Sequence, residues 1–144
     1  MPQELIHEGY RITDDPAKID FAAIKEFLAR SYWASDRSPD VIASSLEHSL
    51  CIGIYAPDGT QVGLARVISD YSTFAYLCDV YVLEPHRGRG LAKAMMRFID
   101  ALPCLQKLRR FQLVTQDAHG LYAQFGFKPI SQIDRHMERR DPSN

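Results

Sequence analysis

The feature that most constrains this chain is a strand that leads through a glycine-rich turn into a helix, within residues 77–98. Residues 79–83 have the β-branched and aromatic content of a strand. Gly88 and Gly90 leave two positions without side chains just before a helical pattern begins near Leu91, so bare N–H groups can converge there on an anion. Positive charge at the same turn comes from Arg87, Arg89 and Lys93. The segment therefore predicts a pyrophosphate-binding turn.

This turn differs from two well-known nucleotide-binding loops. It lacks the Lys-Ser/Thr ending of a Walker loop and the spacing of a dinucleotide fingerprint. A strand, a Gly-x-Gly and a helix are equally compatible with an ordinary connection. The order Arg-x-x-Gly-x-Ala, from Arg87 to Ala92, resembles the coenzyme A loop of the GNAT superfamily of N-acetyltransferases.

A second segment, residues 109–127, strengthens the resemblance. Residues 110–115 have a strand pattern, Asp117 is a candidate N-cap for a short helix, and Gly126 fits the C-terminal stop of that helix. The segment ends in Tyr-x-x-x-Gly-Phe, at residues 122–127, and this resembles the short helix beside the thioester in the same superfamily. The two segments have the order and separation typical of that family.

The resemblance implies a fold, a donor and a set of contacts. The implied reaction is direct transfer from acetyl-CoA to a primary amine without a covalent enzyme intermediate, with Tyr122 as the general acid that protonates the leaving thiolate. Thr115 stands where the family often has Asn, which changes one polar contact to the cofactor. The implied contacts to acetyl-CoA are Val80, Tyr81, Val82, Arg87, Gly88, Arg89, Gly90, Leu91, Ala92, Thr115, Tyr122 and Phe125.

The general base has several candidates. Asp79 lies in an apolar strand, so it either has a partner such as Arg66 or has a raised pKa. We favour the base role slightly, because Asp79 directly precedes the strand segment assigned to the thioester. Glu84, His119 and a chain of waters are the other candidates.

The acceptor site is predicted from the N-terminal half of the chain. Its candidate residues are Tyr32, Trp33, Arg66 and Asp70. Aromatic rings with carboxylates suit a cationic or amphipathic amine. Core packing explains the two aromatic residues equally well.

The order of elements predicts an α/β (α+β) fold with a mixed sheet flanked by helices, the GNAT acyl-CoA N-acyltransferase fold, in one domain over residues 1–144. A helix is expected to open at residues 14–16, and another at Ser38 before an N1 proline. Strands are expected at residues 9–13, 50–55, 61–68, 74–82 and 110–115, a helix at 91–102, and one or two final strands after Phe127.

Composition narrows the classes of function. The chain has 144 residues, 46% of them hydrophobic and 24% charged, and a net charge of −1, so the whole molecule has no electrostatic reason to bind nucleic acid or an acidic membrane. The N-terminal sequence lacks the apolar core of a signal peptide, and no apolar run approaches the ~20 residues that span a bilayer. Three widely spaced cysteines favour a reducing, cytoplasmic location, and five scattered histidines predict no metal site.

We therefore predict an acetyl-CoA-dependent N-acetyltransferase that acts on the primary amine of a small molecule. Two alternatives remain open: a non-catalytic acyl-CoA-binding sensor on the same fold, and an N-acetyltransferase for proteins or peptides. An exposed edge of a C-terminal strand would allow a homodimer.

Overall fold

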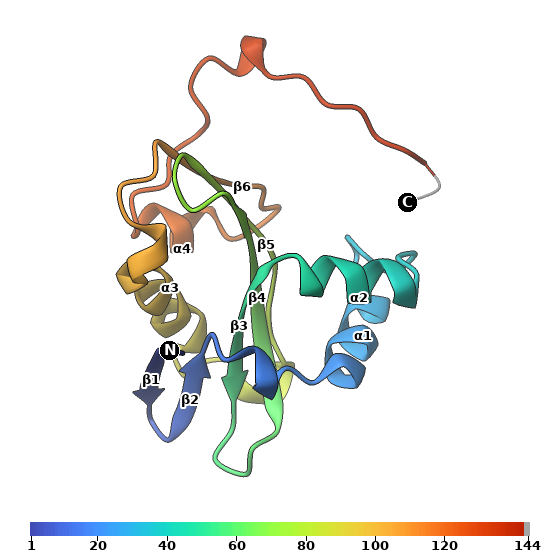
Figure 1. Cartoon of the computed structure of the whole chain (residues 1–144), viewed down its shortest axis with the longest axis vertical. Helices are drawn as coiled ribbons and strands as arrows, with labels where there is room; N and C mark the ends of the chain where they lie inside the picture. Colours follow the sequence, from blue (N-terminus) through green and yellow to red (C-terminus); the bar gives the residue numbers. More distant parts are fainter. Residues whose placement is uncertain (143–144) are drawn as a thin grey trace.

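The computed structural model describes residues 1–142 and contains a six-stranded mixed sheet with helices on both faces (Figure 1). The strands are β1 (Glu4–His7), β2 (Tyr10–Thr13), β3 (Leu50–Tyr55), β4 (Gln61–Ser69), β5 (Phe74–Val82) and β6 (Arg110–Leu113). The helices are α1 (Phe21–Arg30), α2 (Pro39–Glu47), α3 (Leu91–Ala101) and α4 (His119–Ala123), with short 3-10 turns η1 (Pro16–Lys18), η2 (Glu84–His86), η3 (Pro103–Leu105) and η4 (Ile133–Arg135). The strands follow chain order across the sheet and are antiparallel, except that β5 and β6 are parallel. This mixed sheet confirms the predicted fold class.

The sheet separates two hydrophobic cores. Helices α3 and α4 lie on one face, and α1 and α2 on the other (Figure 1). The larger core forms where Met95 and Ile99, one turn apart on α3, pack against strand residues such as Ile52. In the smaller core, the Phe27 ring of α1 stacks on Tyr81 of β5, with ring centroids 3.8 Å apart.

The N-terminal strand predicted from the sequence is part of a hairpin. Only the strand at residues 9–13 was expected, whereas β1 pairs with β2 along its whole length. The connecting residues Glu8 and Gly9 have φ angles of 49° and 84°. Positive φ at both central positions is the geometry of the two-residue turns that match the twist of a hairpin. The Glu-Gly pair is a weaker signal for such a turn than Asn-Gly or Asp-Gly, and the four-residue strand is too short to show a clear pattern.

The first long helix begins later than predicted. Asp15 caps only the short turn η1, through a hydrogen bond from the Ala17 N–H. The chain then becomes extended, and Asp20 caps α1 by accepting from the Ala23 N–H. The prediction of α2 is confirmed, because the Ser38 hydroxyl caps it and Pro39 is its first residue.

The end of the chain differs most from the prediction. Strand β6 ends at Leu113, and the expected strand after Phe127 is wrong for the described residues, because residues 128–142 contain only the turn η4 and are exposed. The last strand in the described chain is β6, which lies at an edge of the sheet, so a homodimer through an exposed strand edge stays a prediction. No helix among residues 1–142 is long and apolar enough to cross a membrane.

Candidate active site

The candidate site lies where β5 and β6 separate. The two strands pair only between residues 74–77 and Arg110–Leu113. Just beyond, a bulge at Asp79, with φ of 52°, interrupts the pairing of β5 with β4. Beyond the bulge, Tyr81 and Val82 pair with β4, and no strand of the described chain lies on the other side of residues 80–82. Their free side can receive an extended ligand, because unpaired strand groups need a hydrogen-bond partner.

The glycine turn forms the second part of the site. Gly88 and Gly90 have φ angles of 80° and 74°, which favour glycine over any other residue. None of the N–H groups of residues 88–93 has a hydrogen-bond acceptor among residues 1–142. Six successive free donors at the start of the eleven-residue α3 create a place for an anion. The Leu91 side chain is buried in the larger core, so only the backbone N–H of Leu91 can contact an anion here.

Arg87 connects the turn to the strand. Its Nε donates a hydrogen bond of 2.8 Å to the Val82 carbonyl oxygen. That carbonyl belongs to the strand segment predicted to bind the cofactor, so Arg87 takes up one acceptor of the segment and holds the end of β5 against the turn. Arg89 lies over the Tyr10 ring instead, 5.9 Å from its centroid.

Tyr122 is held on the short helix α4. Its ring is buried and contacts Phe127 edge-on at 5.9 Å, and Phe127 contacts Phe111 of β6 in the same way. The Tyr122 hydroxyl forms no hydrogen bond with any of residues 1–142. Burial is the main cause that raises the pKa of Tyr122 to about 12, and the charge of Asp117 adds to it. The phenol therefore keeps its proton at neutral pH.

The start of α4 corrects one prediction. Asp117 is not its N-cap; the N-cap position is Ala118, whose N–H donates to the Thr115 hydroxyl at 3.0 Å. Thr115 therefore supports the helix that carries Tyr122. Phe125 is partly buried against the larger core, and Gly126 has the predicted left-handed conformation, with φ of 88°.

Asp79 is fully engaged, which corrects the expectation that favoured an unpaired carboxylate. Its carboxylate accepts hydrogen bonds from Arg66 Nε at 2.8 Å, from Arg37 Nη1 at 2.9 Å and from the Trp33 indole at 2.8 Å. Burial alone would raise the pKa of Asp79, but the hydrogen bond and charge of Arg66, together with Arg37, hold that pKa below its usual range. Such a carboxylate is a weak base at neutral pH.

Arg37 is the residue of this cluster that sequence reasoning missed. It lies in the connection between α1 and α2, and its partner Asp79 is 42 residues away. No local pattern in the sequence marks it. Arg37, Arg66 and Asp79 together carry a net charge of +1, so this cluster offers no spare carboxylate to a cationic amine.

The other predicted acceptor residues divide into two groups. Tyr32 is 68% exposed and contacts the Trp33 ring edge-on, so both rings border the open side of the cluster. Asp70 instead closes the turn between β4 and β5. Its carboxylate accepts from the hydroxyl and N–H of Thr73 and from two neighbouring N–H groups, and these bonds lower its pKa. Its oxygens are therefore committed to the turn.

Two cysteines, the buried Cys51 and the partly buried Cys78, flank Arg66 across the sheet. Cys51 of β3 and Cys78 of β5 are both in register with Arg66 of β4. Burial raises the pKa of each thiol to about 11, more strongly than the charge of Arg66 lowers it. Because the thiolate is the nucleophile, neither cysteine is suited to form an acyl intermediate at neutral pH.

Asp79→Asn tests the structural role of this cluster. Asn tolerates the left-handed backbone at this position but leaves two arginines without a counter-charge. We expect the variant to lose about 2 kcal/mol of unfolding free energy at pH 7, less than for a fully buried pair because Arg37 is partly exposed. A depressed pKa stabilises the fold above the pKa of the unfolded chain, so the deficit should shrink as the pH falls below about 4.

Urea unfolding at several pH values measures this deficit. Asp36→Asn, in the same exposed connection, is the control and should change stability by less than about 0.5 kcal/mol. A folded Asp79→Asn variant of unchanged stability that loses the acidic limb of its kcat/KM profile would instead restore Asp79 as the base.

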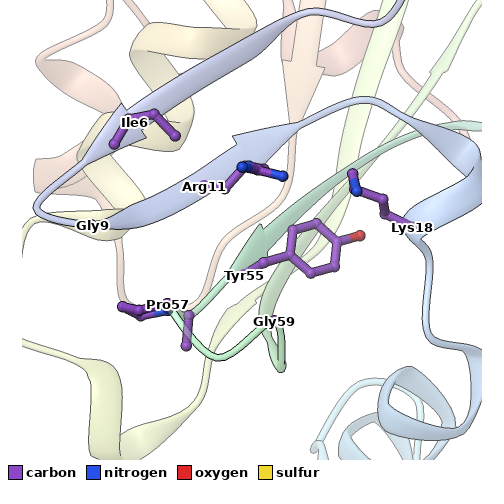
Figure 2. Close-up of a pocket in the computed structure, with 8 residues that line it drawn as sticks. Ile6, Gly9, Arg11, Lys18, Tyr55, Pro57 and Gly59 are labelled. Atoms are coloured by element: carbon purple, nitrogen blue, oxygen red, sulfur yellow. The ribbon is translucent and has the colours of Figure 1, made fainter.

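A separate pocket lies beside the N-terminal hairpin, at the same end of the sheet as the glycine turn. It measures about 280 Å³ and is formed by the β1–β2 hairpin, η1 and the β3–β4 turn (Figure 2). The Tyr55 ring borders it, and the buried Tyr55 hydroxyl has no hydrogen-bond partner in residues 1–142. Its lining residues are Ile6, Gly9, Arg11, Lys18, Tyr55, Ala56, Pro57 and Gly59. None of the predicted site residues is among them.

Comparison with known proteins shows the family of this chain. The family described as "Acetyltransferase (GNAT) domain" matches residues 48–129. The chain is 33% identical to "Putative acetyltransferase FG08082" of Gibberella zeae, over 92% of this chain and 87% of that protein. A crystal structure of a GNAT-family protein from Xanthomonas campestris pv. campestris is 46% identical, with a TM-score of 0.90 over 96% of this chain and 97% of the other.

The fold extends to more distant structures. A Clostridium acetobutylicum protein, solved with acetyl-CoA, has a TM-score of 0.64 at 14% identity, over 97% of this chain and 96% of the other. The family match covers more than half of the chain and includes the strand, the glycine turn and α4. The chain therefore belongs to the GNAT family of acetyltransferases.

Proposed function

We propose that this protein transfers the acetyl group of acetyl-CoA directly to the primary amine of a small molecule. The observation that carries the proposal is the run of six N–H groups, at residues 88–93, that have no acceptor in the described chain and lie at the start of α3. Donors in this arrangement suit the phosphates of coenzyme A. The acetyl-CoA in the C. acetobutylicum structure supports the choice of donor.

When bound, acetyl-CoA supplies an activated acetyl thioester. In the proposed reaction the amine nitrogen forms a bond to the acetyl carbon, the carbon–sulfur bond breaks, and the sulfur takes up a proton. The chain's own groups divide this work. Residues 80–82 bind the pantetheine arm through their open backbone side, and an N–H of this segment stabilises the charge that develops on the carbonyl oxygen.

Tyr122 is the proposed general acid. Its raised pKa keeps a proton on the phenol, and its hydroxyl makes no competing hydrogen bond within residues 1–142. The proton lost by the amine goes to a chain of waters or to His119, which is exposed and begins α4, three residues before Tyr122. Asp79 is left out of this role because three donors occupy its carboxylate.

Two alternatives remain. A non-catalytic acyl-CoA sensor would need the turn at residues 88–93 but not Tyr122. A protein or peptide N-acetyltransferase would need an acceptor site open to a chain. The exposed Tyr32 ring is compatible with either kind of acceptor.

One experiment separates the three functions. Calorimetry with CoA tests the turn, and thiol release from acetyl-CoA is then followed with a panel of small amines, N-terminal peptides and lysine peptides. We expect CoA to bind and at least one small amine to raise thiol release well above the amine-free background. Binding without any stimulated release would favour the sensor, release with peptides alone would favour the protein acetyltransferase, and absence of CoA binding would overturn the proposal.

A further inference from the structure

The N-terminal hairpin contacts the glycine turn at three points. The His7 Nε2 lies 2.8 Å from the Arg89 carbonyl oxygen. The Tyr10 hydroxyl and His86 Nδ1 are 2.8 Å apart, and the Arg89 guanidinium lies over the Tyr10 ring. Strand β1 also packs beside α3, the helix that the turn begins (Figure 1). The hairpin therefore braces the turn from residues more than seventy positions away.

The contacts with the hairpin restrict a turn that has few other restraints on its backbone. Two of its residues are glycines in the left-handed region, and glycine has more backbone freedom than any other residue. The N–H groups of residues 88–93 form no hydrogen bonds within residues 1–142 that would fix their directions. A turn that must be ordered when its ligand binds loses affinity, whereas one that is already ordered does not.

We propose that His7 is a positioning residue for the phosphate-binding turn, a role that rests on the proposed function. A carbonyl oxygen only accepts hydrogen bonds, so the His7 Nε2 carries the proton in this contact. The Arg89–Gly90 peptide is trans, so its C=O and N–H point in opposite directions. The bond from His7 holds the C=O toward the hairpin and thereby directs the Gly90 N–H away from it, where it remains available to an anion.

Both oxygens close to the His7 Nε2 are acceptors, which favours a proton on this nitrogen. The Glu8 carboxylate lies 3.1 Å from the same Nε2, and the His7 side chain is 24% exposed. An ideal Cβ at Gly90 would lie 3.5 Å from His7 Nε2, so the ring and the turn are in close contact. His7 therefore acts on the turn through one directed hydrogen bond and through contact with its backbone.

Two substitutions of His7 separate the hydrogen bond from packing. His7→Gln keeps a side-chain N–H at a similar reach, whereas His7→Leu keeps bulk but has no donor. We expect His7→Leu to weaken CoA binding about tenfold, equivalent to 1.4 kcal/mol, and His7→Gln to stay within about twofold of the wild type. With acetyl-CoA, His7→Leu should raise KM and leave kcat nearly unchanged.

A donor without phosphates provides the decisive control. S-acetylpantetheine has the thioester but not the pyrophosphate, so both variants should use it as well as the wild type does. Equal CoA affinity in His7→Leu and the wild type would overturn the role of His7, as would equal losses in both variants or an equal loss with S-acetylpantetheine.

A second variant guards against a misfolded His7→Leu. Tyr10→Phe removes the hydroxyl contact to His86 and keeps the ring under Arg89, and it should weaken CoA binding about threefold. Unchanged CoA affinity in Tyr10→Phe would contradict bracing by the hairpin. If the wild type binds no CoA, the proposed function fails and the role of His7 fails with it. If the wild type binds CoA and His7→Leu and His7→Gln have the same CoA affinity, only the role of His7 fails.

Discussion

Replacing Gly90 with Glu is expected to weaken CoA binding at least about 100-fold, or about 2.7 kcal/mol. Gly90 has a φ of 74°, which a side chain adopts only with strain. The new carboxylate would also lie at the start of α3, where it can accept hydrogen bonds from the free N–H groups of residues 88–93 and repel the phosphates. Calorimetry with CoA measures the loss.

Gly59→Glu is the matched control for this change. Gly59 has a φ of 91° and open space around a built Cβ, and it lies in the β3–β4 turn, outside residues 88–93. The two variants therefore share the backbone strain and the added charge but differ in position. Comparable CoA affinity in both would remove the glycine turn from the proposed site.

Tyr122→Phe is expected to lower kcat by about 100-fold while the affinity for acetyl-CoA changes little. The Phe ring can keep the edge-on contact with Phe127, so α4 should stay in place. Only the hydroxyl is lost, and its raised pKa makes it a proton donor throughout the neutral range. Pre-steady-state and steady-state thiol release, together with calorimetry, separate the chemical step from binding.

Tyr55→Phe removes a hydroxyl from the last residue of β3, which is not among the predicted site residues, and serves as the control. That hydroxyl is buried without a partner in residues 1–142, so its removal should leave activity unchanged. If Tyr122→Phe slows the chemical step less than about threefold, the sulfur leaves unassisted or takes its proton from another donor.

Local patterns predicted the parts of the fold that depend on nearby residues. The strands from residue 50 to 82, the Ser38 cap and the helix after Gly90 depend on alternation, capping and glycine positions, all of which a short window contains. The four-residue strand β1 has too few positions to show alternation, and it is stabilised by its pairing with β2. The helices and strands between residues 38 and 101 were therefore predicted more accurately than those in the first and last segments of the chain.

Side-chain partners were harder to predict than elements. The pairing of Asp79 with Arg66 was one of the two alternatives that the sequence allowed, and it could be foreseen because the two residues lie on neighbouring strands. The contact of Arg37 with Asp79 could not be foreseen, because it depends on how the α1–α2 connection folds back over the sheet. The contact of His7 with Arg89 likewise depends on tertiary structure across 82 residues. The roles proposed for Tyr122 and the glycine turn come from motifs, which carry information that periodicity lacks.

The bracing of the turn by the hairpin has a consequence for the order in which this protein folds. The strands follow chain order across the sheet, so most pairing is between neighbours in the sequence, and such contacts form early. The contacts of the hairpin with residues 86–90 close loops of 76 to 82 residues, which carries a larger entropic cost. On the ribosome the hairpin is synthesised first and must wait for the turn to emerge. The glycine turn is therefore among the last parts of this protein to take its shape, although both of its glycines belong to a short stretch of sequence.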